Sequence, residues 1–149
     1  MRHNWNNITM IGMPASGKST VGVLLAKRIG YQFIDSDILI QNQEKRLLKE
    51  IIAQDGLEGF LAIEEQVNCG IQADRAVIAP GGSVIYGKTA MEHLKEIGTV
   101  VYLKISYEDL EKRLGNLVDR GVALKDGMTL RDLYDERTEL YEKYADVTI

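Results

Sequence analysis

The chain has 149 residues, of which 45% are apolar and 27% are charged. This length and this balance are typical of one globular domain, and they exclude a fibrous chain or a disordered tail. The 18 Lys and Arg residues against 22 Asp and Glu residues give a net charge of -4. That sign is opposite to the one a nucleic-acid-binding surface needs, so we expect no nucleic-acid partner.

The sequence also carries no signal for a membrane. Its apolar runs are all shorter than the roughly 20 residues that a bilayer span needs, and its polar first residues do not make a signal peptide. We therefore expect a single domain over residues 1–149, located in the cytoplasm, as a monomer or a weak homodimer.

Short β-type runs alternate with helical patterns along the chain. This alternation is typical of an α/β fold with a mainly parallel sheet. The sequence predicts five strands, over residues 8–11, 33–34, 76–79, 99–103 and 146–149. It predicts helices over residues 19–29, 88–97, 107–114 and 130–144.

Two further segments interrupt this alternation. Residues 38–73 show helical periodicity and no strand pattern, which predicts an insertion of two or three helices with a break at Asp55-Gly56. Residues 115–127 contain three glycines and mixed charges, and a loop of this length is often a functional lid.

The most specific motif lies between the first expected strand and the first expected helix. Residues 12–19 read GMPASGKS and fit the pattern G-x-x-x-x-G-K-[ST]. Such a loop binds phosphate, because its backbone N–H groups and the helix N-terminus favour an anion. Lys18 would follow the transferred phosphoryl group, and the Ser19 hydroxyl would bind Mg²⁺. We predict ATP and Mg²⁺ as cofactors, with nucleotide contacts from Gly12, Ala15, Ser16, Gly17, Lys18, Ser19 and Thr20.

The carboxylates for metal and acceptor must come from elsewhere, because the strand expected at 76–79 has none. Asp35 and Asp37 are the nearest candidates, at the carboxyl end of the second strand, where ligands gather in open α/β sheets. In an extended segment both side chains point the same way. One could then reach a metal-bound water and the other an acceptor hydroxyl. The structural alternative is that Asp37 only caps the following helix.

The order of these features resembles the shikimate kinase family of small P-loop kinases over nearly the whole chain. The resemblance rests on the P-loop, the acidic turn at 35–37, Asp55-Gly56 followed by Phe60 and Glu64, and the turn at 80–82. It continues through Arg113, Arg120, Arg137, Tyr141 and Ala145. The family transfers the γ-phosphoryl group of Mg-ATP to a ring hydroxyl of shikimate, so the resemblance implies a kinase that acts on an alcohol group of a small hydroxylated metabolite.

The resemblance also implies roles for the residues around the acceptor. Asp37 would bind the acceptor hydroxyl and aid its deprotonation, and Asp35 would reach the metal through water. Gly81 and Gly82 would present backbone N–H groups to the acceptor and the γ-phosphate, at a close approach that a Cβ would hinder.

Three arginines receive roles in the same way. Arg113 would flank the adenine, and Arg120 in the lid would close on the transferring phosphoryl group, as a catalytic partner of Lys18 and Asp37. Arg137 would bind the carboxylate of the acceptor.

The chain departs from the family pattern at Leu61, where the family has a second arginine for that carboxylate. Leucine cannot replace a bidentate guanidinium. A kinase for another small hydroxylated acceptor, such as a sugar acid or an amino alcohol, is therefore one alternative. The family also normally continues beyond the position of Ile149, so a nucleotide-binding regulatory module with weak catalysis is a second alternative.

Overall fold

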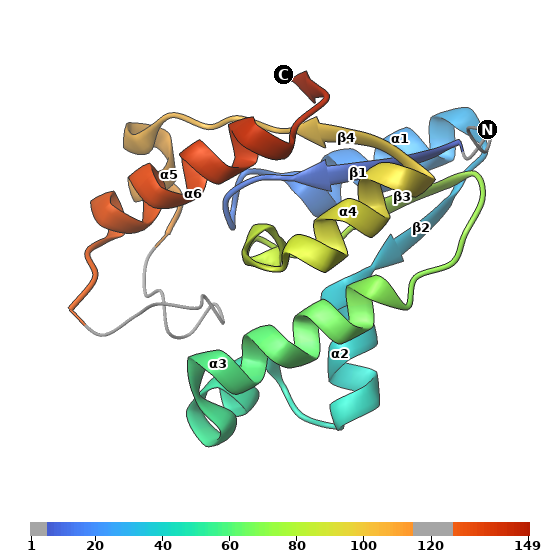
Figure 1. The fold of residues 1–149 in the computed structure, drawn as a ribbon. Coiled ribbons are helices and arrows are strands. Elements are labelled where there is room, and N and C mark those ends of the chain that lie inside the picture. Colours follow the sequence, from blue (N-terminus) through green and yellow to red (C-terminus); the bar gives the residue numbers. More distant parts are fainter. Residues whose placement is uncertain (1–5, 115–126) are drawn as a thin grey trace.

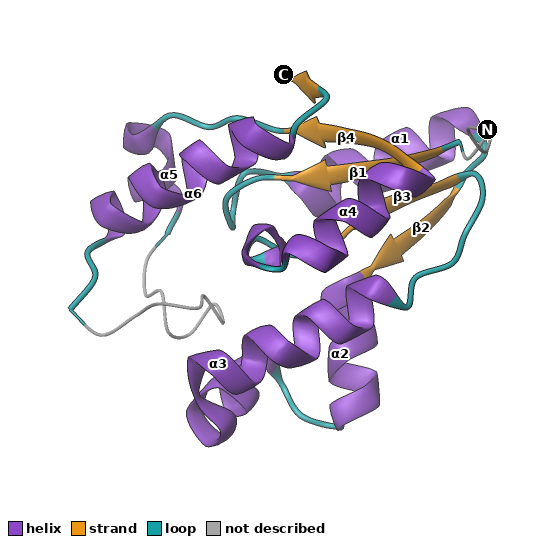
Figure 2. Cartoon of the chain, in the orientation of Figure 1, coloured by secondary structure: helices purple, strands orange, loops and turns teal. Residues whose placement is uncertain are grey.

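The computed structural model describes residues 6–114 and 127–149. Within this part of the chain, five strands form one parallel sheet in the order β2-β3-β1-β4-β5. The strands are β1 (Asn7–Ile11), β2 (Gln32–Asp35), β3 (Ala76–Ala79), β4 (Gly98–Tyr102) and β5 (Val147–Thr148). The arrowheads of β1, β2 and β4 in Figure 2 point toward the same end of the sheet, and β3 pairs in parallel with β1 and β2. This confirms the predicted α/β class and its five-stranded parallel sheet.

Helices cover both faces of the sheet (Figure 1). They are α1 (Lys18–Ile29), α2 (Ser36–Glu44), α3 (Leu48–Cys69), α4 (Lys88–Ile97), α5 (Tyr107–Arg113) and α6 (Leu130–Tyr144), with a short 3-10 helix η1 (Val84–Tyr86). Helix α1 packs on one face, whereas α4 and α6 pack on the other.

Alternating side chains of the central strands form the two halves of the core. Met10 and Val77 pack toward α1, and their neighbours Ile11 and Ile78 pack into the larger cluster that contains α4 and α6. All four residues of β3 are buried. Burial on both faces explains why the strands read as continuous apolar runs.

Asn7 joins three backbone segments at the amino end of the sheet. Its side-chain Nδ2 donates to the carbonyl oxygens of Ala73 at 2.7 Å and Ile97 at 3.0 Å, and its Oδ1 accepts from the N–H of Ala76 at 2.9 Å. The side chain is buried. A buried amide whose donors and acceptor are used in this way fixes the backbone around it.

Helices α2 and α3 form the predicted insertion. Ile40, Ile51 and Phe60 make a small core of their own between them. Helix α3 bends at Gly56, whose φ of 76° and ψ of 176° are not helical, so the expected break lies inside one element. Arg46, in the turn between the two helices, binds both carboxylate oxygens of Asp55 at 3.1 and 2.9 Å.

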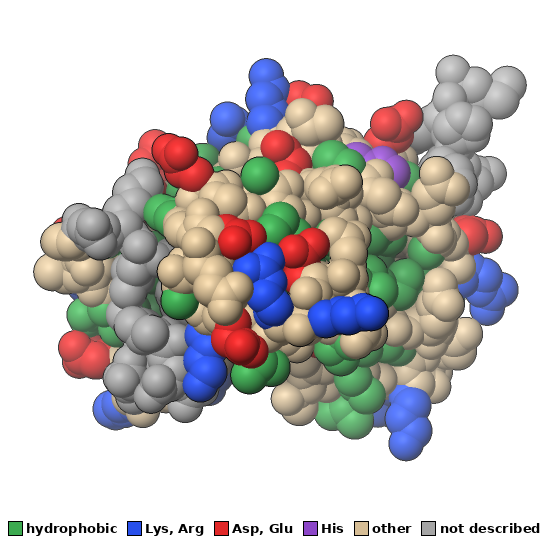
Figure 3. Space-filling model, turned by 90° about the horizontal axis from the view of Figure 1, so that it is seen from below, with side chains coloured by type: hydrophobic (Ala, Val, Ile, Leu, Met, Phe, Trp, Pro, Cys, Tyr) green, Lys and Arg blue, Asp and Glu red, His purple; other side chains and the backbone are tan. Residues whose placement is uncertain are grey.

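Residues 115–126, and with them most of the predicted lid, lie outside the described residues. No helix in the described ranges is long and apolar enough to cross a membrane. On the face shown in Figure 3, acidic and basic side chains are interspersed, with no large basic patch.

Candidate active site

The phosphate-binding loop connects β1 to α1 and depends on two glycines. Gly12 has a φ of 152°, and a Cβ added to it would lie 2.7 Å from the carbonyl oxygen of Leu103. Gly17, the N-cap of α1, has a φ of 98°. No side chain caps α1 and its first turn carries no acidic residue. The first N–H groups of this helix are therefore left for an anion.

Lys18 folds back over this loop. Its Nζ donates to the carbonyl oxygens of Gly12 at 2.7 Å and Met13 at 2.8 Å. Burial is the largest cause that lowers the pKa of Lys18, which is about 8 even though the opposite charge of Asp37 raises it. The ammonium group thus lies at the loop, with two weak carbonyl partners that an anionic phosphate can replace.

The two aspartates do not lie in one extended segment, so this expectation was wrong. Helix α2 begins at Ser36, and Asp35 is its N-cap. The Asp35 Oδ1 accepts from the backbone N–H groups of Asp37 at 2.9 Å and Ile38 at 3.3 Å. The helix cap is therefore Asp35 rather than Asp37, and the side chain of Asp37 is free of that duty because it lies in the first turn.

Asp37 has the electrostatics of a proton acceptor near neutral pH. Burial first, and then the neighbouring charge of Asp35, raise the pKa of Asp37 to about 6, against the opposing charge of Lys18. A carboxylate with a raised pKa is a stronger base than an ordinary aspartate and is still ionised at pH 7.

The turn after β3 passes between several of these side chains. Gly81 has a φ of 89°, and a Cβ added to it would lie 3.0 Å from Asp37 Oδ1 and 3.0 Å from Glu64 Oε2. A Cβ on Gly82 would lie 3.1 Å from Arg137 Nη1. Glycine at both positions leaves the backbone of the turn open to a bound molecule.

Arg137 reaches this turn from α6. Its side chain is 1% exposed, and its guanidinium lies over the ring of Tyr86, 5.5 Å from the ring centre. Tyr141, one turn later on α6, donates a hydrogen bond from its hydroxyl to the carbonyl oxygen of Gly82. These contacts fix a buried cation beside the glycine turn.

The structure brings Glu64 and Ser83 into the same site. The sequence named Glu64 only as part of the family pattern around Leu61, and it gave Ser83 no role. Glu64 is 2% exposed, and Ser83 Oγ lies 2.7 Å from its Oε1 and 2.8 Å from its Oε2. Burial raises the pKa of Glu64 to about 8, despite the hydrogen bond from Ser83. Ser83 directly follows the glycine turn, and that position was the only signal for it in the sequence.

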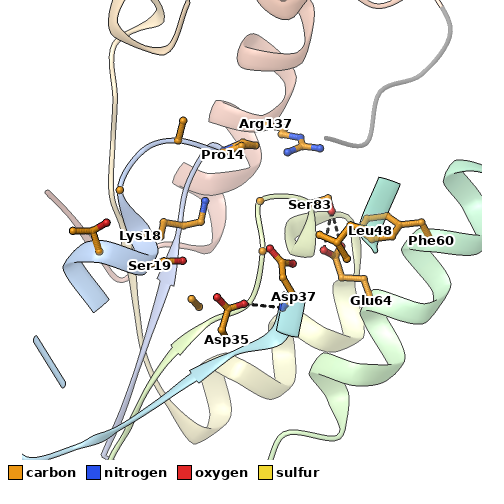
Figure 4. A pocket seen from close by; sticks show the side chains of 16 residues that line it. Pro14, Lys18, Ser19, Asp35, Asp37, Leu48, Phe60, Glu64, Ser83 and Arg137 are labelled. Atoms are coloured by element: carbon orange, nitrogen blue, oxygen red, sulfur yellow. Dashed lines mark hydrogen bonds between the residues drawn. The ribbon is translucent and has the colours of Figure 1, made fainter. Parts of the chain in front are cut away.

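One cavity of about 310 Å³ joins these elements (Figure 4). The predicted site residues that line it are Ala15, Gly17, Lys18, Ser19, Thr20, Asp35, Asp37, Gly81, Gly82 and Arg137. Leu48, Phe60, Glu64 and Ser83 also line it. Its walls therefore come from the phosphate-binding loop, the helical insertion, the turn after β3 and α6.

Four predicted residues are not in this lining. Gly12 and Ser16 are buried in the phosphate-binding loop, and Ser16 Oγ has no hydrogen-bond partner among the described residues. Arg113 is exposed, and its Nη1 donates to the carbonyl oxygen of Ala15 at 3.0 Å. Arg120 lies outside the described residues.

The donor set in the cavity suits Mg²⁺ bound mainly through phosphate. Ser19 and Asp35 offer oxygen ligands on the same cavity. In the part of the chain that the structure describes, no group of three His, Cys, Asp or Glu side chains could hold a metal ion. Mg²⁺ binds through few protein ligands and keeps its waters and phosphate oxygens, so the residues present fit this ion.

The strand order, the loop after β1 and a carboxylate facing that loop across one cavity define a P-loop kinase. The comparison with protein families gives a narrower class: a family model described as shikimate kinase matches residues 14–149. The chain belongs to the shikimate kinase family, as the sequence predicted, and it is a phosphotransferase with an alcohol group as acceptor.

Individual relatives agree with this assignment. A shikimate kinase of Rippkaea orientalis is 38% identical over 146 residues, which cover 96% of this chain and 77% of that protein. One from Clostridium botulinum, strain Langeland, is 42% identical over 142 residues, covering 92% and 83%. The solved shikimate kinase from Acinetobacter baumannii in complex with shikimate has a TM-score of 0.82 at 30% identity, with 98% of this chain and 83% of that chain covered.

Proposed function

We propose that this protein transfers the γ-phosphoryl group of ATP to a hydroxyl of shikimate. The observation that carries the proposal is the single cavity on which Lys18, Asp37 and Arg137 meet. It supplies one cation for the phosphoryl group, one carboxylate for the hydroxyl and one cation for an acceptor carboxylate. The match to a solved shikimate kinase that holds shikimate supports this acceptor.

The residues of the chain divide the reaction between them. Asp37 accepts a hydrogen bond from the acceptor hydroxyl and takes its proton as the new oxygen–phosphorus bond forms and the bond to ADP breaks. Lys18 leaves the loop carbonyls and stabilises charge on the transferring group. Ser19 and Asp35 would hold Mg²⁺, Asp35 through water, and the ion supplies further charge neutralisation when it is bound.

The remaining predictions from the sequence complete this proposal. Arg120 is the proposed second cation on the phosphoryl group, and Arg113 the proposed neighbour of the adenine. We also propose that the protein acts in the cytoplasm. We propose that it is a monomer or a weak homodimer, and light scattering after gel filtration measures this oligomeric state.

Leu61 does not oppose shikimate as the acceptor. Leu61 packs with the apolar residues of the helical insertion and lines a smaller, second cavity rather than the main one. Together with the family assignment, this favours shikimate over the alternative acceptors and over a regulatory module.

A coupled assay for ADP release tests the proposal. We expect turnover that depends on Mg-ATP and on added shikimate, with kcat/KM higher than for any sugar acid or amino alcohol in a panel of small alcohols. A higher kcat/KM for one of those compounds would assign a different acceptor. ATP binding without acceptor-dependent turnover would indicate a regulatory module. The Leu61→Arg variant, measured beside the native chain, shows how far this position controls the KM of shikimate.

A further inference from the structure

Glu64 occupies an unusual position in the wall between two cavities. It lines both the main cavity and the second cavity of about 120 Å³, which Leu61, Glu65 and Tyr86 also line. Within the described residues, the hydrogen bonds of its carboxyl group go to Ser83 alone (Figure 4). One hydroxyl can donate only one hydrogen, and Leu61, one helical turn earlier, offers no charge.

A buried carboxylate with so few donors is costly to ionise. The charged groups that face Glu64 from other elements are Asp37 on α2, Arg137 on α6 and Lys18 on α1. Burial is the largest influence and raises the pKa of Glu64 to about 8; Asp37 acts in the same direction, whereas Arg137 and Lys18 oppose it. At neutral pH the carboxyl group of Glu64 therefore carries a proton and can donate a hydrogen bond.

This carboxyl group lies at the acceptor side of the cavity. Glu64 Oε2 and Asp37 Oδ1 would both lie 3.0 Å from a Cβ on Gly81, and Arg137 Nη1 would lie 3.1 Å from a Cβ on Gly82. An acceptor seated on this turn with its anionic group at Arg137 also meets Glu64. An ionised Glu64 would repel that group, whereas a neutral one can donate to it.

We propose that Glu64 is a specificity-determining residue that binds the carboxylate of the acceptor as a neutral hydrogen-bond donor. The proposal rests on the proposed function, because it takes the acceptor to be shikimate, a hydroxylated carboxylic acid. Arg137 supplies the charge for that carboxylate, and Glu64 supplies a second, directed donor. The KM of shikimate consequently rises when Glu64 loses its proton.

The test measures the KM of shikimate from about pH 6.5 to about pH 9.5 at saturating Mg-ATP, in the native chain and in Glu64→Gln. Glutamine keeps a donor and cannot ionise. We expect the native KM to rise by about tenfold per pH unit above the inflection, and the KM of Glu64→Gln to change by less than about twofold over the same range. Lys18 titrates in the same pH range, but it is present in both proteins, so its effect is common to both KM profiles. We expect the pH profile of kcat to have the same shape in the native chain and in Glu64→Gln.

Two further variants separate a binding role from a structural one. Ser83→Ala removes the hydrogen bond that lowers the pKa of Glu64, so the inflection of KM moves to higher pH. Glu65→Gln, in the second cavity, leaves the inflection where it is. If circular dichroism shows that Glu64→Gln is unfolded, the inflection pH of the shikimate KM in Ser83→Ala is the test. An inflection that stays at the native pH would then overturn the role of Glu64.

The outcomes distinguish this inference from the proposed function. A native KM that does not change with pH, or a Glu64→Gln variant whose KM rises in parallel with the native one, overturns the role of Glu64 while the kinase assignment stands. A native chain that fails to phosphorylate shikimate at any pH overturns the proposed function itself.

Discussion

Asp35 holds the helix on which Asp37 lies: its Oδ1 accepts the backbone N–H of Asp37 at 2.9 Å. The same carboxylate lines the cavity and is the proposed ligand of a water on Mg²⁺. One side chain would thus combine a structural task with the proposed catalytic one, and substitutions can separate the two.

Asp35→Ser keeps an oxygen that can cap α2 but removes the charge, whereas Asp35→Ala removes both. Loss of a helix cap costs about 1 kcal/mol, so we expect only Asp35→Ala to lower the free energy of unfolding in urea by that amount. Both variants should need more Mg²⁺ for half-maximal activity. An unchanged Mg²⁺ requirement in Asp35→Ser would leave Asp35 with the structural task alone.

Asp37→Asn tests the proton acceptor. We expect kcat/KM for shikimate to fall by about 10²- to 10⁴-fold, the usual contribution of general base catalysis. Because the pKa of Asp37 is raised to about 6, native activity should fall as the pH drops through about 6, and the variant should lose this dependence. Asp109→Asn, on the exposed side of α5, is the matched control. An Asp37→Asn enzyme with native activity would remove Asp37 from the mechanism.

Lys18 should control the alkaline side of the reaction with ATP. Its pKa is lowered to about 8, so the charged form is present below that pH and is lost above it. We expect kcat/KM for Mg-ATP to fall as the pH rises through about 8, and Lys18→Met to lose at least about 10²-fold in kcat. Lys27→Met, an exposed position on the same helix, should behave as the native chain. A flat profile for Mg-ATP would show that this charge is not needed.

Gly81→Ala should damage binding as well as stability. The substitution strains a backbone with a φ of 89° and places a methyl group 3.0 Å from both Asp37 and Glu64. Gly30→Ala is a matched control, because its φ is 73° but a Cβ there meets nothing within 4 Å. We expect both variants to lose about 1 kcal/mol of unfolding free energy from the strained backbone, and only Gly81→Ala to raise the KM of shikimate. Equal KM values for shikimate in the two variants would show that the acceptor does not bind at this turn.

Much of the architecture could be predicted from local sequence. The apolar runs at 8–11 and 76–79 coincide with strands, and the break at Asp55-Gly56 coincides with the bend in α3. These features depend on residues close together in the chain. The strand order was not predicted, because it depends on which distant segments pair.

The site was harder to predict wherever burial decides the chemistry. Asp35 and Asp37 were correctly placed near the phosphate-binding loop, but the start of α2 at Ser36 turns one of them into a cap. Glu64 follows an ordinary helical pattern, and its pairing with Ser83 arises only when α3 packs against the turn after β3. This contact joins residues 19 positions apart, and the sequence around either residue does not predict it.

The triple contact of Asn7 lies at the amino end of the sheet, whereas the cavity lies beyond the carboxyl ends of the strands. A substitution at Asn7 should therefore lower the amount of folded protein in the cell, while each folded molecule keeps the normal turnover rate. A substitution in the cavity should instead lower the turnover rate and leave the amount of folded protein unchanged. An inactive allele of this gene can thus be sorted by protein abundance alone, before any kinetic measurement.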